Sequence, residues 1–288
     1  MIDLIAPPRR GVSPNDIALA MTGRPYMSYS EISTFQACPL KWQFQYVDKA
    51  KQEQLSSAMI LGSAVHAAIQ VHMESLMAHD RPLTVDGLMD SYREHWKKES
   101  GTAPIQYAKG QDSSTMEATA RRMLETFMAS EHAKPAGQII GIEESFRIKL
   151  ADNLPDLAGR VDMITHSNDE LVVTDFKTAR SMWADETAED RGEQLILYAQ
   201  GCEPIARELD AKVKLQFVII TKTKEPKVEA IPQKWSAAST TGQLTGAVQI
   251  PLFSSEMISM HREEKVICIA VFFFLNVTDS TICVMRSF

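Results

Sequence analysis

The stretch that decides the fold reads GRVDMI at residues 159–164, THSNDE at 165–170 and LVVTDFKT at 171–178. Apolar residues alternate or run in short blocks on both sides of the polar segment His166–Asp169. Short apolar segments joined by a polar break are typical of two β-strands and a turn, and they do not suit a helix interior. The stretch therefore predicts a β-hairpin.

Two acidic residues and one lysine lie in this predicted hairpin. Asp162 belongs to the first strand, and Asp175 precedes Lys177 by two residues near the end of the second. Because side chains repeat every second residue along a strand, Asp175 and Lys177 point to the same face. Buried charges are costly unless they are paired, and two carboxylates beside one ammonium would suit a hard divalent cation. A salt-bridged surface hairpin is the alternative, and Asp-x-Lys alone favours it.

Apolar periodicity predicts further elements around the hairpin. The predicted helices are one that begins with a capping box at Ser28-x-x-Glu31, then Met59–His79, Thr84–Lys98, Ser113–Ala129 and Glu193–Leu209. The predicted strands are Gln138–Leu150, with a bulge near Glu143-Glu144, and a second hairpin of Val213–Thr221 and Pro226–Ile231. Gln194 and Tyr198 are four residues apart and share one helix face, which would point toward the strand that holds Asp175.

Taken together, the motifs of the chain resemble the RecB-like branch of the PD-(D/E)xK nuclease superfamily. The matching order is Gly62-x-x-x-His66, then Asp162, then Asp175-Phe176-Lys177 thirteen residues later, then Gln194-x-x-x-Tyr198. That branch includes the nuclease domains of the RecB and AddB recombination proteins and the CRISPR-associated RecB-like exonucleases. The resemblance covers roughly Ser28 to Ile231. It implies an α/β restriction-endonuclease-like core, in which a central mixed sheet is flanked by helices, with an N-terminal helical lobe.

The resemblance also implies an active site. In this family one or two Mg²⁺ or Mn²⁺ ions would be held by His66, Asp162, Asp175 and the backbone carbonyl of Phe176. Lys177 would orient a water molecule or stabilise the phosphate during hydrolysis. Gln194 and Tyr198 would position the lysine and contact the nucleic acid. A histidine beside two carboxylates tilts the metal preference modestly toward Mn²⁺.

Two of these assignments have structural alternatives. A single histidine on an apolar helix is usually a packed core residue, and only the Gly62-x-x-x-His66 spacing of the family favours a metal ligand. Glu143 resembles the acidic residue that the family carries near the active site on its first sheet strand. An ordinary charge at a strand edge explains Glu143 equally well. If this strand contributes to the site, we expect Glu143 rather than Glu144 to do so.

We expect three regions along the chain. Residues 1–26 carry Pro, Gly and Arg without periodicity and are predicted to form a poorly ordered arm. The nuclease domain is expected over residues 27–235, with the helical lobe at about 58–132. The resemblance fails beyond Trp235, so residues 236–288 are expected to form a divergent C-terminal tail.

The charge and hydropathy of the chain limit its function classes. The 288 residues carry a formal net charge of −7, and the pI is near 5.6. This balance argues against a protein that coats DNA by bulk electrostatics, so contact with DNA would be local. The longest apolar run, Val266–Val277, is too short to span a bilayer, and the N-terminus lacks the apolar segment of a secretory signal. We therefore expect no membrane partner and a cytoplasmic, intracellular location.

The cysteines argue against an iron–sulfur cluster. They are Cys38, Cys202, Cys268 and Cys283, and they include no Cys-x-x-Cys pair. Family members with a cluster supply one cysteine equivalent to Cys38 and three close together after the catalytic core. Only Cys38 is at a family position here, and a buried thiol beside aromatic residues is its simpler role.

The sequence thus predicts a metal-dependent DNA exonuclease that acts on single strands or DNA ends, in recombination, repair, phage or CRISPR-related processing. A non-catalytic DNA-binding or assembly subunit that retains the fold is the alternative. A third possibility is a nuclease that works with a helicase, a recombinase or a CRISPR adaptation complex. The presence of the motif aspartates and lysine favours an active enzyme over a decayed one.

Overall fold

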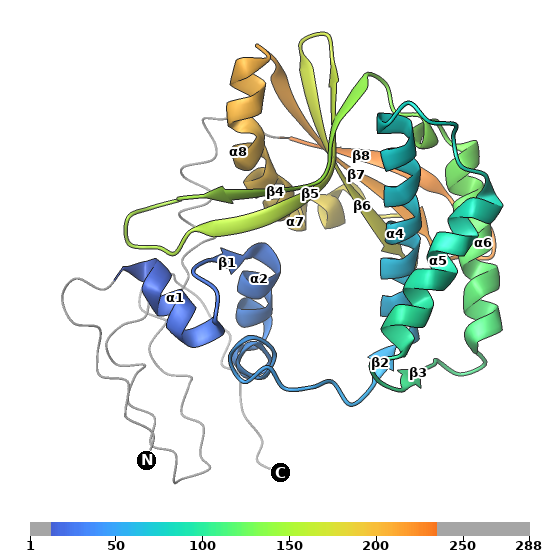
Figure 1. Ribbon diagram of the computed structural model, residues 1–288, viewed down its shortest axis with the longest axis horizontal. Coiled ribbons are helices and arrows are strands. Elements are labelled where there is room, and N and C mark those ends of the chain that lie inside the picture. Colours follow the sequence, from blue (N-terminus) through green and yellow to red (C-terminus); the bar gives the residue numbers. More distant parts are fainter. Residues whose placement is uncertain (1–12, 235–288) are drawn as a thin grey trace.

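The computed structural model describes residues 13–234, and a mixed β-sheet lies at its centre (Figure 1). The strands of this sheet are β1 (Met27–Ser28), β4 (Gln138–Ile148), β5 (Leu157–Ser167), β6 (Glu170–Ala179), β7 (Lys212–Thr221) and β8 (Val228–Gln233). Their order is β1-β5-β6-β7-β8, and β4 also pairs with β5. The β5–β6 and β7–β8 pairs are antiparallel, whereas β6 and β7 are parallel. Both predicted hairpins and the predicted mixed sheet are confirmed.

Strand β6 is covered on both faces because its sequence is almost continuously apolar. Residues 173–176 are all buried, including Thr174 and Asp175. Such a run is typical of a strand within a parallel pair. The chain reaches parallel β7 through α7 (Asp185–Asp190) and α8 (Glu193–Glu208), since parallel strands need a long crossover. The crossover places α8 against one face of β6.

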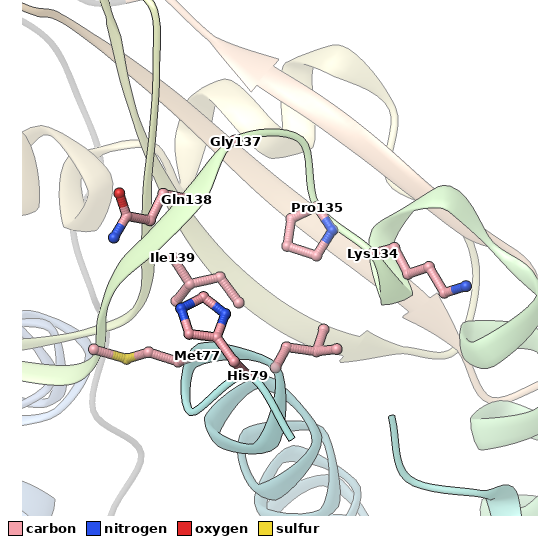
Figure 2. Close-up of a pocket in the computed structure, with 8 residues that line it drawn as sticks. Met77, His79, Lys134, Pro135, Gly137, Gln138 and Ile139 are labelled. Carbon is pink, nitrogen blue, oxygen red and sulfur yellow. The ribbon is translucent and has the colours of Figure 1, made fainter. Parts of the chain in front are cut away.

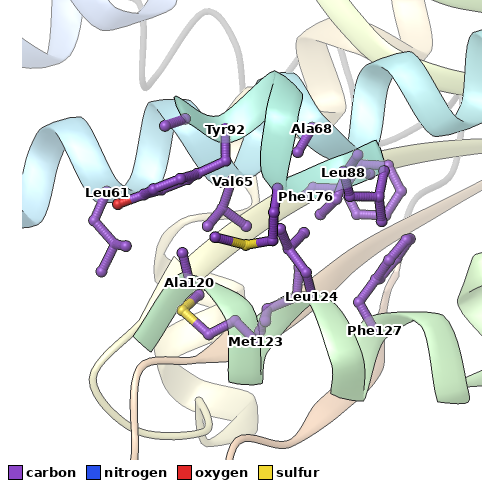
Figure 3. Packing of buried hydrophobic residues seen from close by; sticks show 14 of the residues in the cluster. Leu61, Val65, Ala68, Leu88, Tyr92, Ala120, Met123, Leu124, Phe127 and Phe176 are labelled. Carbon is purple, nitrogen blue, oxygen red and sulfur yellow. The ribbon is translucent and has the colours of Figure 1, made fainter. Parts of the chain in front are cut away.

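The helical lobe covers the opposite face of the sheet (Figure 1). It consists of α4 (Ser57–Met77), α5 (Val85–Ser100) and α6 (Ser113–Ala129), with the short strands β2 (Leu55–Ser56) and β3 (Ile105–Gln106) and the 3₁₀ turn η2 (Glu131–Ala133) at its margins. Figure 3 shows Phe176 of β6 packed among side chains of this lobe. The helix predicted at Ser113–Ala129 coincides with α6, where the Asp112 side chain accepts a hydrogen bond from the Thr115 N–H.

The N-terminal segment corrects one expectation. Within the predicted arm, residues 14–22 form helix α1 (Pro14–Thr22), which has proline at its first position and a capping box between Ser13 and Asp16. Gly23 ends the helix in the left-handed conformation, where glycine is favoured. Helix α2 (Tyr29–Ala37), the single turn α3 (Pro39–Trp42) and the π-helical turn η1 (Gln43–Val47) follow. Residues 1–12 and the predicted tail lie outside the described residues.

The predicted capping box at the start of α2 forms only in part. The Ser28 hydroxyl accepts a hydrogen bond from the Glu31 N–H, but the Glu31 carboxylate does not return to Ser28. It is fully buried and accepts hydrogen bonds from Arg24 at 2.6 Å and from the Trp42 indole at 3.3 Å. Burial raises the pKa of Glu31, although Arg24 and Trp42 favour the charged form. Glu31 therefore links α2 to the segments before and after it.

Strand β4 is irregular, as predicted, but its register shift lies earlier than expected. The pairing with β5 shifts between Ile139 and Gly141, whereas the sequence predicted a bulge near Glu143-Glu144. Glu143 itself has a φ of 53°, in the left-handed region that non-glycine residues rarely adopt. Such a conformation persists only when the surrounding structure holds it.

Within residues 13–234, none of the helices combines the length and the apolar composition that a membrane span requires.

We expect Gly159→Ala to destabilise the protein, because the β4–β5–α8 junction has no space for a methyl group. The added Cβ would overlap the Phe146 ring and lie 3.1 Å from Tyr198 Cε1. The ring cannot retreat, since it also packs against Gly201, where a Cβ would be 2.5 Å from it. Overpacking of this kind costs about 1–3 kcal/mol of unfolding free energy. Thermal and urea unfolding would measure the loss, and Gly87→Ala, with its nearest atom at 3.7 Å, is the matched control that should leave stability unchanged or raise it.

Candidate active site

The site begins where the β5–β6 ladder ends. The last backbone pair is Met163 with Thr174. Asp162 lies directly before Met163 on β5, and Asp175 lies directly after Thr174 on β6. Both aspartates are therefore at the point where the two strands stop pairing with each other. Beyond this pair the Phe176 N–H donates to Asp162 Oδ2 at 2.7 Å. The Asp162 carboxylate thus bridges the two diverging strands. A sheet that opens at this point leaves room for both carboxylates on adjacent strands.

Helix α4 brings His66 to this opening. Its Nε2 lies 2.9 Å from Asp162 Oδ2 and 3.2 Å from the Phe176 carbonyl oxygen, and its Nδ1 lies 3.8 Å from Glu143 Oε1. One ligand atom from each of His66, Glu143 and Asp162 lies within 4.8 Å of the other two. The left-handed conformation of Glu143 accompanies this placement on β4. Three elements therefore converge on one cluster of carboxylate and imidazole groups.

The electrostatics of the cluster favour positive charge. Burial opposes protonation of His66, but the hydrogen bond to Asp162 and the charges of Asp162, Asp175 and Glu143 raise its pKa above the ordinary value. Burial also raises the pKa of Glu143, and the Asp162 charge raises it further, against the opposing effect of Arg160. A carboxylate whose pKa is raised by burial and by a second carboxylate is typical of functional sites, including those that bind cations.

A second group of site residues lies on the α8 side of β6. The Lys177 ammonium lies 2.5 Å from Asp175 Oδ2 and donates to Gln194 Oε1 at 3.2 Å. Gln194 in turn donates to the Tyr198 hydroxyl at 2.5 Å. Gln194 and Tyr198 are one turn apart on α8, so both side chains project from the same face of that helix. The chain from Tyr198 to Asp175 fixes the position of Lys177.

Asp175 is the most deeply buried carboxylate of the site, with 2% of its side chain exposed. Burial raises its pKa to about 6, although Lys177 favours the charged form. The Lys177 ammonium is therefore the group that compensates the buried Asp175 charge.

The motif residues predicted from the sequence all meet at this opening, but in two subsets. The close ligand cluster contains Glu143, for which the sequence left the role open, and does not contain Asp175. Two contributors were not predicted. Arg160 forms an ion pair with Glu143 at 2.6 Å, and Phe146 packs edge-on against Tyr198 with ring centroids 5.7 Å apart. The position of Arg160 two residues before Asp162 could have indicated a shared strand face, but no local signal indicated Phe146.

The family model of the PD-(D/E)XK nuclease superfamily matches residues 26–251. This chain belongs to the PD-(D/E)XK nuclease superfamily. The superfamily consists of phosphodiesterase nucleases that use divalent metals. In this chain the structure gathers the motif residues where the β5–β6 ladder ends. No curated protein matches the sequence of this superfamily member.

Two solved structures are similar to this superfamily member at low sequence identity. One is described as "Putative exonuclease" from Eubacterium rectale, with 12% identity, coverage of 77% of each chain and a TM-score of 0.48. The other is described as SSO0001, with 14% identity, coverage of 76% of this chain and 82% of that chain, and a TM-score of 0.29.

The residues of the site fit a hard divalent cation. Carboxylate and carbonyl oxygens are the preferred ligands of Mg²⁺ and Mn²⁺, and an imidazole is compatible with Mn²⁺. Asp162, Glu143, His66 and the Phe176 carbonyl supply such donors close together, and the Asp175 carboxylate, paired with Lys177, is a further oxygen donor. The site is therefore consistent with the metal use of the superfamily, and it does not identify the metal.

A separate pocket lies away from these residues, at the C-terminal end of α4 (Figure 2). Its volume is about 250 Å³. Its lining consists of Leu76, Met77, His79, Lys134, Pro135, Gly137, Gln138 and Ile139. His66 precedes Leu76 by ten residues on the same helix, a distance of about 15 Å along the axis. None of the lining residues belongs to the site.

His66→Ala is expected to weaken metal affinity about 10- to 100-fold with little effect on the melting temperature. The reason is that the His66 side chain is 28% exposed and its polar contacts are to the site, so its loss removes a ligand and little packing. Isothermal titration with Mn²⁺ and thermal unfolding would measure the two effects. His72→Ala is the matched control on the same helix, because His72 is fully buried and should lose stability while metal affinity is retained. A core role for His66 would reverse this pattern.

Proposed function

We propose that this protein is a metal-dependent deoxyribonuclease of the RecB-like branch, acting as an exonuclease on single strands or DNA ends. The observation that carries the proposal is that two groups of residues meet where the β5–β6 ladder ends. One is the cluster of His66, Glu143 and Asp162, and the other is Asp175 with Lys177. The order of the motifs along the chain supports the RecB-like branch and, with it, action on ends.

The residues of the site have separable roles in phosphodiester hydrolysis. Asp162, Asp175, His66 and the Phe176 carbonyl would hold the metal, with Glu143 beside them. A bound Mg²⁺ or Mn²⁺ ion supplies an acidified water and neutralises charge on the phosphate. Lys177 would orient the attacking water or stabilise negative charge that develops on the phosphate oxygens. Gln194 accepts a hydrogen bond from the lysine and thereby holds the ammonium in place.

The alternative of a non-catalytic subunit has less support. A protein that had lost activity would have no need to keep a buried aspartate beside a lysine, because such a pair is costly to bury. A partner such as a helicase, a recombinase or a CRISPR adaptation complex would change the biological context of the reaction and would leave the chemistry of hydrolysis the same. We propose DNA as the substrate in each case.

Incubation with end-labelled single- and double-stranded DNA tests the proposal. In Mg²⁺ or Mn²⁺ we expect the label to be released from single strands or ends, and in EDTA or with Lys177→Ala we expect intact DNA. Labels at the 5′ and 3′ ends separate the two directions of digestion. Binding without cleavage in every metal would favour the non-catalytic subunit and contradict the proposal.

The purified protein is also expected to be colourless and to hold no stoichiometric iron. Cys38 was expected to be a buried thiol, but it is exposed, whereas Cys202 is buried and burial raises the pKa of its thiol to about 12. A thiol that is hard to deprotonate is a poor ligand for iron. Cys268 and Cys283 lie outside the described residues. Iron analysis and the absorbance near 400 nm would check this expectation, and a brown preparation would contradict it.

A further inference from the structure

Lys222 lies beside the first turns of α4, close to the end of β6. It follows β7 directly, and its backbone N–H donates to the Ala179 carbonyl at 2.7 Å. Its ammonium donates to the Ala58 carbonyl at 3.0 Å, which brings the side chain across the end of the sheet to the helical lobe. An ammonium group has three N–H donors. One of them is directed to Ala58, so others remain for a ligand.

The charge of Lys222 is not neutralised by a carboxylate that the structure describes. Burial lowers its pKa, and the neighbouring positive charge of Arg180 lowers it further. Two cations thus meet at the adjacent ends of β6 and β7. A partly buried ammonium beside a guanidinium is unfavourable unless an anion approaches both. This corner of the molecule is electrostatically suited to a phosphate.

Gly62 keeps space open beside this ammonium. A Cβ added at Gly62 would lie 2.9 Å from Thr178 Oγ1 and 3.7 Å from Lys222 Nζ. The hydroxyl and the ammonium therefore flank the same point on α4, and only a hydrogen occupies it. A hydroxyl and an ammonium on either side of a glycine are a suitable set of donors for phosphate oxygens.

This cradle of Gly62, Thr178 and Lys222 is next to the proposed site. Thr178 follows Lys177 on β6, and its side chain points to α4, whereas Lys177 points to α8. Gly62 precedes His66 by one helical turn on the same face of α4, a separation of about 5–6 Å between Cβ positions. That separation is comparable to the distance between successive phosphates of one nucleic-acid strand.

We propose that the cradle binds the backbone phosphate next to the scissile phosphate, and that Lys222 is a positioning residue for a single DNA strand. The inference rests on the proposed nuclease function, because it takes the His66 cluster as the place of the scissile phosphate. Since the contact is to the backbone alone, it would hold strands of any sequence. It would also provide the local basic contact that an acidic protein needs in order to hold DNA.

Lys222→Met tests the cradle, because it removes the charge and keeps a long apolar stem. Binding of a fluorescent single-stranded oligonucleotide would be measured by anisotropy in Ca²⁺ over a range of salt concentrations. We expect affinity to fall about tenfold and the slope of log K against log salt to decrease by about 0.7. Lys224 is an exposed lysine in the same turn, so Lys224→Met is the matched control. It should leave the affinity and the salt slope unchanged. Thr178→Val keeps the shape of the side chain and removes the hydroxyl, so it should weaken binding of the oligonucleotide. This variant tests the cradle if Lys222→Met does not fold.

A second substrate sharpens the assignment. An oligonucleotide with one uncharged methylphosphonate next to the terminal linkage should bind more weakly than the normal strand to the wild-type protein and equally to Lys222→Met. If the wild type cleaves DNA and Lys222→Met behaves as Lys224→Met does, the cradle is wrong and the nuclease function stands. If the wild type neither binds nor cleaves DNA, the nuclease function and the cradle both fall.

Discussion

Asp162→Asn is expected to reduce metal-dependent cleavage by about 10³-fold while the protein stays folded. The asparagine amide oxygen can still accept the hydrogen bond from the Phe176 N–H, which Asp162 accepts at 2.7 Å. The fold is therefore kept, but the negative charge opposite His66 is lost, and with it the carboxylate that lies closest to both His66 and the Phe176 backbone. Single-turnover cleavage, a Mn²⁺ titration and thermal unfolding would measure the three quantities.

Asp156→Asn provides the matched control for this change. Asp156 precedes β5 and pairs with Arg147 at 2.9 Å, outside the site, so its loss should leave cleavage near the wild-type rate. A wild-type rate for Asp162→Asn would remove Asp162 from the site. A large fall in the melting temperature would instead assign Asp162 a structural role in joining β5 to β6.

Lys177→Met is expected to reduce cleavage by about 10²- to 10³-fold at saturating metal. Two effects combine, because the ammonium is lost from the phosphate and the buried Asp175 loses the charge that lies 2.5 Å away. Without this partner, Asp175 binds a proton more readily and becomes a weaker ligand. The initial rate of release of an end label from single-stranded DNA in Mg²⁺ or Mn²⁺ measures the loss.

The two residues should therefore behave as one unit. We expect the double variant Asp175→Asn/Lys177→Met to be little worse than either single variant, since each change already disables the pair. Lys227 is an exposed lysine between β7 and β8. Lys227→Met therefore controls for the loss of a positive charge and should retain activity. Strictly additive losses would show that Asp175 and Lys177 act independently, against the pairing seen in the structure.

The local sequence was sufficient for the elements whose signals are continuous along the chain. The alternation around residues 165–170 predicted the β5–β6 hairpin, and the apolar periodicity of Ser113–Ala129 predicted α6. Helix α1 was missed although its signals are present, because Ser13, Pro14 and Asp16 form a capped helix start that the Pro- and Gly-rich surroundings obscured. The residues that start this helix all lie within residues 13–16, so its cause is local.

The parts that could not be predicted depend on contacts distant in sequence. The backbone conformation of Glu143 follows from its position opposite His66 and Arg160, and no property of residues 138–148 alone favours a φ of 53° there. The parallel pairing of β1 with β5 and the contact of Tyr29 with Glu193 are likewise set by packing. For the candidate site, the family motifs named the side chains that we expect to act, whereas their separation into a ligand cluster and a lysine network required the structure.

The hydrogen bond from the Phe176 N–H to Asp162 has a consequence for amide hydrogen exchange. Val173 lies inside β6, which is paired with β5 on one side and β7 on the other, so we expect its amide to exchange only when much of the sheet opens. The Phe176 amide depends on one carboxylate at the open end of that ladder. Its exchange can therefore proceed through a local opening of the site while the sheet stays intact. The protection of this single amide reports the order of the candidate active site separately from the stability of the fold.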